Sequence, residues 1–306
     1  MLYAAIDIGS NAVRLLFANV FEKQGVTRIE KASLIRIPLQ LGKDVFKSGK
    51  ISSSRAKNFI NTMKAFKLLI DVYKPVDYIA CATAAMREAV NRDAILSKLE
   101  SEVGMKVHLI DGTLEAKIIR SVNNNTFQNS EGISLLIDVG GGSTELSLEK
   151  GNDFIDSRSF NLGTIRLLNN EYDQHVWSEM KEWLNKHKAH FGKINCLGTG
   201  GNINKYTKLY GDNDSKILSL INLKNGYQEL DLLTAEERTE KFGFRPDRAD
   251  VIVPAGKIYI EIMNHIQAET IFVPRIGLVD GLILGLHEKT LFKTKKKINK
   301  SKKNNL

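Results

Sequence analysis

The sequence has few residues of the kinds that mark several protein classes. Among its 306 residues there are only two cysteines and five prolines, and hydrophobic residues make up 42%. This composition excludes collagen-like and disordered chains. Cys81 and Cys196 lie in separate apolar runs, with no second cysteine or histidine at the spacing of metal ligands. We therefore expect buried, reduced thiols, and the alternatives are a disulfide or a catalytic thiol.

Long hydrophobic runs are also absent. No window reaches the roughly 18 consecutive apolar residues that a membrane-spanning helix needs. An acidic residue, Asp7, comes too early in the first apolar segment for a secretory signal peptide. We therefore expect a cytoplasmic protein that makes no contact with a membrane.

Acidic residues are missing from the C-terminal end. Residues 289–306 contain eight lysines and no Asp or Glu, which leaves 36 Lys and Arg against 35 Asp and Glu in residues 1–288. The larger part of the chain is therefore nearly neutral. We expect residues 295–306 to form a solvated basic tail, and the alternative is a weak, salt-sensitive contact with nucleic acid or another polyanion.

Two common nucleotide-binding motifs do not occur. None of the Gly-Lys pairs is followed by Ser or Thr, so there is no Walker P-loop. The spacing of Gly198 and Gly200 would require a third glycine where Ile203 stands, so the dinucleotide fingerprint is incomplete as well. Any phosphate site must therefore be built in another way.

The first part of the chain reads as strands followed by helices. Five strands are predicted from apolar and β-branched runs between turn residues, at Tyr3–Ile8, Val13–Phe21, Thr27–Leu39, Val76–Cys81 and Lys106–Ile110. Ser52 is a candidate N-cap for a helix whose apolar residues recur at helical spacing over 56–70. A single helix is expected over 84–103, ended by Gly104.

The opening strand-turn-strand unit recurs in the second half. Segments Ile6–Asn11 and Ile137–Thr144 both place an aspartate between apolar residues, followed by glycine and small polar residues. Such a repeat predicts two similar α/β units with a ligand-binding cleft between them. We expect an N-terminal unit over 1–120 and a C-terminal unit over 121–280, with a final helix at about 281–294 that packs back on the first unit.

Three turns place small residues directly after a strand, at Asp7–Asn11, Asp138–Ser143 and Leu197–Asn202. Glycine lets the backbone come close to a ligand, so that successive N–H groups can point at phosphate oxygens. Two of the turns begin with aspartate, which suits a divalent ion between carboxylates and phosphate. An ordinary tight turn is the alternative for each. Arg14 and Arg166 are close enough to reach the cleft or to form surface salt bridges.

Six segments follow one another in the order found in a known family: Ala5–Asn11, Ala82–Ala89, Asp111–Ala116, Ile137–Glu145, Leu162–Leu167 and Arg248–Val253. They resemble the exopolyphosphatase and guanosine pentaphosphate phosphohydrolase family, in the superfamily of acetate kinase, sugar kinases, heat-shock chaperone ATPases and actin. The Asp-x-Gly-Gly-Gly-Ser-Thr-Glu block at 138–145 is the most specific. The resemblance implies an α/β fold of two actin-like (ribonuclease H-like) domains, whose mixed sheets face an interdomain cleft.

The resemblance also implies roles for single residues. Glu115, the glutamate before an alanine at the start of a helix, corresponds to the general base, and we expect the helix dipole to keep it ionised. Asp138 and Glu145 match positions that hold Mg²⁺ (or Mn²⁺), and Asp7 completes the expected metal set. The expected phosphate-binding residues are Ser10, Asn11, Arg87, Gly140, Gly141, Gly142, Ser143, Thr144, Gly200 and Gly201.

The implied activity is release of terminal orthophosphate from inorganic polyphosphate, or of the 5′-phosphate of guanosine pentaphosphate, by metal-assisted attack of water. The alternatives are a kinase of the same superfamily and a nucleotide- or alarmone-binding regulator without turnover. Leu114 stands where many relatives have a second glutamate, which leaves the choice of substrate open. The chain resembles the short, two-domain members, and the resemblance suggests a homodimer.

Overall fold

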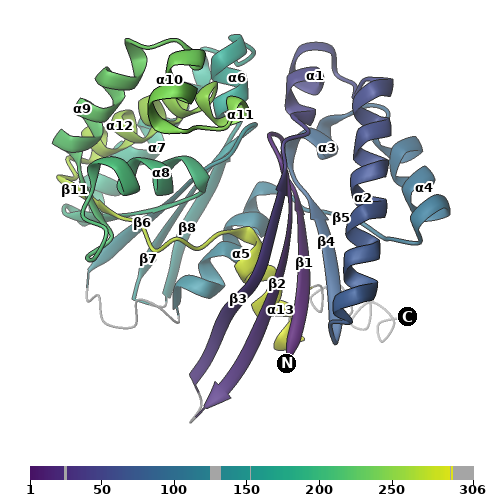
Figure 1. The fold of residues 1–306 in the computed structure, drawn as a ribbon. Helices are drawn as coiled ribbons and strands as arrows, with labels where there is room; N and C mark the ends of the chain where they lie inside the picture. Colours follow the sequence, from purple (N-terminus) through teal and green to yellow (C-terminus); the bar gives the residue numbers. More distant parts are fainter. Residues whose placement is uncertain (24–25, 125–131, 152, 290, 292–306) are drawn as a thin grey trace, which may run out of the picture.

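Two mixed β-sheets, one in each half of the chain, organise the fold (Figure 1). The computed structural model describes residues 1–23, 26–124, 132–151, 153–289 and 291. The predicted basic tail, 295–306, lies outside the described residues. The first sheet has five strands in the order β3-β2-β1-β4-β5, and the second has six in the order β10-β11-β9-β6-β7-β8. The α/β class and the two-domain arrangement predicted from the sequence are confirmed.

The first half contains β1 (Leu2–Ile8), β2 (Val13–Lys23), β3 (Val26–Ile37), α1 (Leu41–Ser48), α2 (Ser53–Tyr73), β4 (Asp77–Ala82), α3 (Ala84–Glu88), α4 (Arg92–Val103), β5 (His108–Leu109) and α5 (Gly112–Asn124). The second half begins with β6 (Ile133–Val139), β7 (Thr144–Lys150), β8 (Asp153–Phe160), α6 (Thr164–Asn169), α7 (His175–Phe191), β9 (Ile194–Thr199) and α8 (Gly201–Tyr210). It continues with β10 (Ile217–Ser219), α9 (Leu220–Asp231), α10 (Ala235–Phe242), α11 (Pro246–Ala249), α12 (Ile252–Ile266), β11 (Thr270–Phe272) and α13 (Leu278–His287). Among the described helices, none has both the length and the hydrophobicity needed to span a membrane.

Both sheets are built on one repeated strand pattern. β1 pairs antiparallel with β2 and parallel with β4, and β6 pairs antiparallel with β7 and parallel with β9. The hairpin turns match as well, because Gly9 N donates to Ala12 O at 3.1 Å and Gly140 N donates to Ser143 O at 2.9 Å. The sequence repeat therefore corresponds to a repeated strand-turn-strand unit.

Side-chain alternation turns the two repeated aspartates towards the space between the halves. In β1, Ile6 belongs to the core beneath α2, whereas Ala5 belongs to a central core that also contains residues of α5 and α13. Asp7 shares the face of Ala5, because alternate side chains of a strand point the same way. In β6, Leu136 faces the central core and Asp138 follows on the same face. The alternation thus aims both aspartates at one region.

Helix α13, the last one in the described part of the chain, packs against the first half. It contacts α5, β1 and β2, and it contributes Leu282 and Ile283 to the central core. Figure 1 shows α13 beside α5 and the first sheet. The chain therefore passes between the halves twice, once after α5 and once after β11.

Two helices replace the single helix that was expected over 84–103. The break at 89–91 is fixed by an exchange of hydrogen bonds between segments, because Ile51 N donates to Asn91 Oδ1 at 3.0 Å and Asn91 Nδ2 donates to Ile51 O at 2.8 Å. A local pattern cannot reveal such a distant partner. Gly104 ends α4 in the left-handed conformation, with φ 69°, as predicted.

Candidate active site

A cleft of about 530 Å³ lies between the two halves, and the three small-residue turns meet there. The turn residues that line it are Asp7, Gly9, Ser10, Asn11, Ala12, Asp138, Val139, Gly140, Gly141, Gly200, Gly201 and Asn202. Gly200 has φ +103°, and a Cβ at this position would lie 3.1 Å from Asp138 Oδ1. Glycine is therefore needed where the third turn approaches the aspartate of the second.

Four polar side chains form one row across the second sheet. In the strand register, Asp138 is paired with Thr199 on β9 and with Glu145 on β7, and Glu145 is paired with Ser159 on β8. Paired residues of neighbouring strands present their side chains on the same face. Thr199 Oγ1 donates to Asp138 Oδ1 at 2.8 Å, and Ser159 Oγ donates to Glu145 Oε1 at 2.8 Å. Each of these carboxylates is thus held by a hydroxyl from the adjacent strand.

Glu115 comes from a helix and completes the cluster. It lies in the first turn of α5, which packs against β7 and β8. Gly112 permits this close packing, because a Cβ there would lie 2.3 Å from Ser159 Oγ and 3.0 Å from Glu145 Oε1. One carboxylate oxygen from each of Glu115, Asp138 and Glu145 lies within 4.8 Å of the others.

Asp7 stands beside this cluster and has a partner of its own. It is paired across the first hairpin with Arg14, whose Nη1 donates to Asp7 Oδ2 at 2.5 Å. Both residues line the cleft. Burial raises the pKa values of Glu115 and Asp138, and the nearby charge of Asp7 adds to this rise. In the described residues, Glu115 rather than Asp7 is the third member of the close carboxylate group.

Burial makes the three clustered carboxyl groups weak acids. Burial, with the nearby charge of Glu145, raises the pKa of Glu115 well above its ordinary value. Burial and the charge of Asp138 raise the pKa of Glu145 to about 7. Burial also raises the pKa of Asp138, against the hydrogen bond from Thr199. These causes correct the expectation for Glu115, because a helix dipole contributes only about 0.3–1 kcal/mol and does not offset burial beside like charges.

The cluster has the donor chemistry of a divalent-cation site. Three carboxylate oxygens this close together repel one another unless protons or a cation neutralise them. Hard cations such as Mg²⁺ and Ca²⁺ prefer carboxylate oxygens. The hydroxyl groups of Thr199 and Ser159 hold Asp138 and Glu145 in the way that outer-shell groups orient metal ligands. Asp138 and Glu145 therefore fit the metal that the sequence resemblance implies, and the Glu115 carboxylate lies beside them.

The expected phosphate-binding residues divide into two groups. Those that line the cleft are Ser10, Asn11, Gly140, Gly141, Gly200 and Gly201. Those that lie behind the described lining are Arg87, Gly142, Ser143 and Thr144. Two of the cleft residues already have partners, because Ser10 Oγ accepts from Ala85 N at 3.2 Å and Asn11 Nδ2 donates to Asp247 Oδ2 at 3.4 Å.

The residues behind the lining support the second hairpin. Thr144 is fully buried, and its Oγ1 donates to Leu162 O at 2.5 Å. The Ser143 hydroxyl is hydrogen-bonded to the Glu145 carboxylate and lowers its pKa. Gly142 packs beneath Phe46, because a Cβ would lie 2.4 Å from Phe46 Cζ. These contacts hold the turn and the carboxylate in position.

Two arginines from the six matching segments, Arg87 and Arg166, lie close to the site but do not line the cleft. Arg87 Nη1 donates to Ile110 O at 2.8 Å, and the arginine charge lowers the pKa values of Glu115 and Glu145. Arg166 Nε donates to Gly142 O at 2.7 Å, and this residue is also paired with a glutamate of α3. Arg166 therefore braces the second turn instead of reaching the cleft.

Basic side chains dominate the rest of the cleft wall. Seven Lys and Arg residues and four Asp and Glu residues line it; the basic ones are Arg14, Lys31, Arg36, Lys205, Lys208, Arg248 and Arg275. Sequence reasoning missed Arg36, Arg248, Thr199 and Ser159 as site residues. Arg248 could have been found, because it opens one of the six matching segments, and Thr199 lies in the third small-residue turn, whereas Arg36 and Ser159 belong to no motif.

The sequence is similar to proteins of about the same length and to longer proteins. It is 27% identical over 307 residues to a bifunctional 3-dehydroquinate synthase/phosphatase from Fusobacterium nucleatum, covering 92% of this chain and 46% of that protein. It is 25% identical to exopolyphosphatase 1 of Mycobacterium leprae, covering 93% and 89%. It is 27% identical to a guanosine-5'-triphosphate,3'-diphosphate pyrophosphatase of Aeromonas salmonicida, covering 93% and 59%. The chain thus spans about half of the first protein and most of the second.

A solved structure covers nearly the whole chain. The Aquifex aeolicus member of the Ppx/GppA protein family has a TM-score of 0.74 and 26% sequence identity, covering 96% of this chain and 99% of that one. The two-domain actin-like arrangement is common to both. The profile of the Ppx/GppA phosphatase family matches residues 20–290, which is well over half of the sequence. This chain therefore belongs to the Ppx/GppA phosphatase family.

Proposed function

We propose that this protein is an exopolyphosphatase-like phosphohydrolase. Its substrates are inorganic polyphosphate, from which it releases terminal orthophosphate, or guanosine pentaphosphate, from which it removes the 5′-phosphate. The observation that carries the proposal is the cluster of Glu115, Asp138 and Glu145 beside three glycine-containing turns in a basic cleft. The names of the exopolyphosphatase and pyrophosphatase relatives agree with this chemistry.

The residues of the cleft match the needs of phosphoryl transfer to water, which depends on positioning and on neutralising negative charge. Bound Mg²⁺ would neutralise phosphate charge and favour the ionised form of the carboxylates. Glu115 reaches the cleft from the first turn of α5 and is the candidate to take the proton of the attacking water. The turns would hold the terminal phosphate, and Arg14 and Arg248 would offset the charge of the rest of the substrate.

Phosphate release from four substrates tests the proposal directly. Long polyphosphate, tripolyphosphate, guanosine pentaphosphate and ATP are each incubated with Mg²⁺ and with a chelator, without any acceptor. We expect release from polyphosphate or guanosine pentaphosphate that stops on chelation. Release that requires an added acceptor would indicate a kinase, and binding without release would indicate a regulator.

Substitution of the proposed base gives the sharper test. We expect Glu115→Gln to lower kcat by about 10²–10⁴-fold with little change in substrate affinity, because a positioned general base contributes about that much. Glu149→Gln is the matched control, since Glu149 is likewise buried and burial raises its pKa to about 7, but it pairs with Arg120 outside the cleft. Near-normal turnover in Glu115→Gln would remove this residue from the mechanism.

The identity of the ion, the compartment and the assembly belong to the same proposal. Mg²⁺ or Mn²⁺ is the proposed ion, because the family resemblance implies it and the carboxylate oxygens suit a hard divalent cation. We also propose a cytoplasmic location and a homodimer, of which the homodimer follows only from the family resemblance. Sedimentation of the purified protein would test the dimer, and a monomer at micromolar concentration would exclude it.

A further inference from the structure

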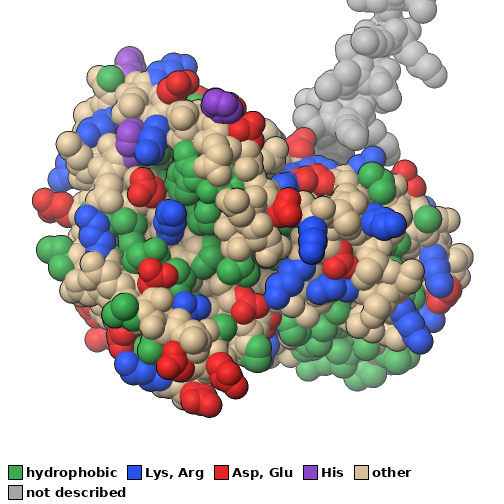
Figure 2. All heavy atoms as spheres, turned by 90° about the horizontal axis from the view of Figure 1, so that it is seen from above, with side chains coloured by type: hydrophobic (Ala, Val, Ile, Leu, Met, Phe, Trp, Pro, Cys, Tyr) green, Lys and Arg blue, Asp and Glu red, His purple; other side chains and the backbone are tan. Residues whose placement is uncertain are grey.

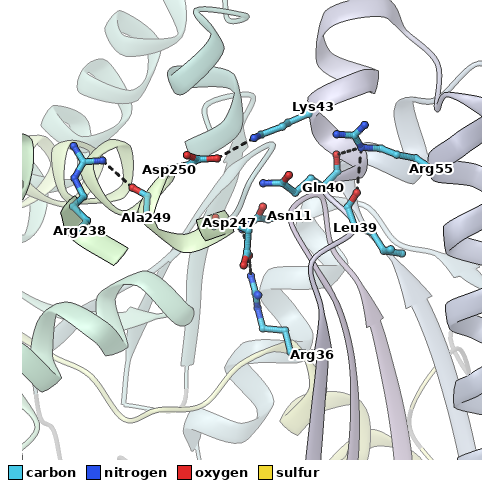
Figure 3. A network of polar contacts seen from close by, with 10 residues as sticks. All are labelled: Asn11, Arg36, Leu39, Gln40, Lys43, Arg55, Arg238, Asp247, Ala249 and Asp250. Atoms are coloured by element: carbon cyan, nitrogen blue, oxygen red, sulfur yellow. Dashed lines mark hydrogen bonds and ion pairs between the residues drawn. The ribbon is translucent and has the colours of Figure 1, made fainter. Parts of the chain in front are cut away.

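Helix α11 is joined to the first half of the chain by polar contacts beside the cleft (Figure 3). Arg36 Nη2 donates to Asp247 Oδ2 at 2.5 Å, and Asn11 Nδ2 donates to Asp247 O at 3.3 Å. Lys43 Nζ donates to Asp250 Oδ2 at 2.9 Å. Seen from above, Lys and Arg side chains lie beside Asp and Glu side chains where the two halves meet (Figure 2). Arg36 and Asn11 of the first half thus both contact Asp247, since Asn11 Nδ2 also donates to Asp247 Oδ2 at 3.4 Å. The separate ion pair between Lys43 and Asp250 lies next to them.

The two ion pairs differ in burial. The side chains of Arg36 and Asp247 are 13% and 7% exposed, whereas those of Lys43 and Asp250 are 31% and 30% exposed. A buried charge is stable only when a partner and hydrogen bonds compensate for its lost hydration. Asp247 therefore fixes the direction of the Arg36 guanidinium, and the more exposed Lys43 pair is expected to contribute little.

Arg36 has hydrogen-bond donors that the described protein atoms do not satisfy. Its Nε and Nη1 are buried and have no hydrogen-bond partner in the described part of the chain. A buried polar group left unpaired costs roughly 1–3 kcal/mol. Because Arg36 also lines the cleft, an anionic ligand is a natural partner, and guanidinium groups bind phosphate oxygens through adjacent N–H donors.

Positive charge exceeds negative charge around this pair. Arg248 follows Asp247 in α11, lines the cleft, and donates a hydrogen bond to Gly201 O. Burial, with the charges of Arg36 and Arg14, lowers the pKa of Arg248 to about 10, against a smaller opposing effect of Asp247. A single buried carboxylate thus faces two cleft arginines, and a further anion would balance them.

Strand register sets the distance of Arg36 from the proposed reaction site. Asp7 is paired with Arg14 on β2, and Arg14 is paired with Arg36 on β3. The three side chains therefore share one face of the first sheet. With neighbouring strands about 4.8 Å apart, the Arg36 backbone lies about 10 Å from that of Asp7. Arg36 thus reaches a part of the ligand remote from the carboxylate cluster.

We infer that Arg36 binds a phosphoryl oxygen of the substrate away from the bond that is cleaved, and that Asp247 is the positioning residue that orients it. This inference rests on the proposed function, because the ligand is the polyphosphate chain or the phosphate-bearing end of the nucleotide. Asp247 also contacts Asn11 of the first turn, so one carboxylate ties the distal anion site to the proposed site of the terminal phosphate.

A double-mutant cycle with a matched control tests the inference. The variants are Arg36→Gln, Asp247→Asn, their double mutant, and Asp250→Asn, which breaks the neighbouring ion pair between the same parts of the fold. We expect Arg36→Gln and Asp247→Asn to raise KM for long polyphosphate roughly tenfold, because a hydrogen bond to a charged group is of that strength, with kcat within about twofold. The double mutant should match Arg36→Gln, because Asp247 acts through Arg36. Asp250→Asn should keep the wild-type KM.

The outcomes separate the competing explanations. An unchanged KM in Arg36→Gln would overturn the inference, and an equal rise in Asp250→Asn would show that these contacts act by holding the halves together. If Asp247→Asn does not fold, the double mutant takes its place, because it removes the charges of Arg36 and Asp247 together. Its KM is then compared with that of Asp250→Asn. Calorimetric titration of long polyphosphate into the same variants with Mg²⁺ measures affinity without turnover. If the wild-type protein released no phosphate, the proposed function would fail while this titration still tested Arg36.

Discussion

A buried carboxyl group beside two others keeps its proton until a cation replaces it. The pKa of Glu145 is about 7 and that of Glu115 is well above its ordinary value, so protons stabilise the cluster when no cation is bound. A divalent cation competes with these protons, and its binding releases them. The affinity of the cluster for a cation should therefore rise with pH around neutrality.

The supporting hydroxyl groups allow a test at single residues. Thr199 holds Asp138 through one hydrogen bond, so we expect Thr199→Val to weaken Mg²⁺ binding about 10–100-fold, the usual effect of losing an outer-shell partner. Titration calorimetry measures this affinity. Thr207→Val is the control, since the buried Thr207 hydroxyl donates to Ile203 O within α8, away from the cleft. Equal weakening in both variants would contradict a specific role for Thr199.

Some site residues can be found from the sequence and others cannot. Asp138 and Glu145 belong to a motif whose spacing is specific, so their participation could be predicted. Thr199 and Ser159 are ordinary residues that become supports only because strand register places them beside those acids. Arg36 has no local signal, because its role depends on a partner from α11, 211 residues further along the chain.

At the scale of elements, α5 decides whether the carboxylates meet. Its N-terminal turn carries Glu115 and packs directly on the strands that carry Glu145 and Ser159. The strands of both hairpins were predictable, because β-branched runs and turn residues are local signals. Helix α1 was not predicted, since its N-cap residue, Gln40, has φ 51° and makes no side-chain capping bond. Local sequence rules therefore do not predict a helix that lacks an N-cap signal, or a helix interrupted by hydrogen bonds to a distant segment.

Close packing at the start of α5 gives a test at this scale. We expect Gly112→Ala to lower the free energy of unfolding by about 1–3 kcal/mol, because the new Cβ overlaps Ser159 Oγ, although alanine favours helices. Glu115 should move with the helix, so phosphate release should fall as well. Denaturant unfolding and the release assay measure the two effects. Thr113→Ala, at an exposed neighbouring position, is the control, and a more stable Gly112→Ala protein would contradict the packing argument.

For the whole molecule, the repeat in the sequence predicted two facing sheets, and the structure confirms this arrangement. The order of elements along the chain does not predict every contact, because α13 packs on β1 although the two are far apart in the sequence. Residues far apart in sequence complete the core beneath the cleft. The predicted homodimer stays a prediction.

The charge state of the cleft should affect the stability of the entire protein. The folded protein keeps a proton on Glu145 up to about pH 7, whereas an ordinary glutamate releases it near 4.5. Between these values the folded state binds more protons than the unfolded state, so this group lowers the free energy of unfolding as pH rises. In chelator, we expect the wild-type Tm to fall more than that of Glu145→Gln between about pH 5 and about pH 8. Excess Mg²⁺ should remove the difference, and identical pH profiles in chelator would contradict this account.

The position of α13 has a consequence for biosynthesis. The strands of the first sheet are complete at residue 109, but one face of that sheet is covered by a helix that spans 278–287. A ribosome releases these parts in order, so the nascent N-terminal half waits with an open apolar face while the second half is translated. We therefore expect the first half to complete its folding only after α13 has been synthesised.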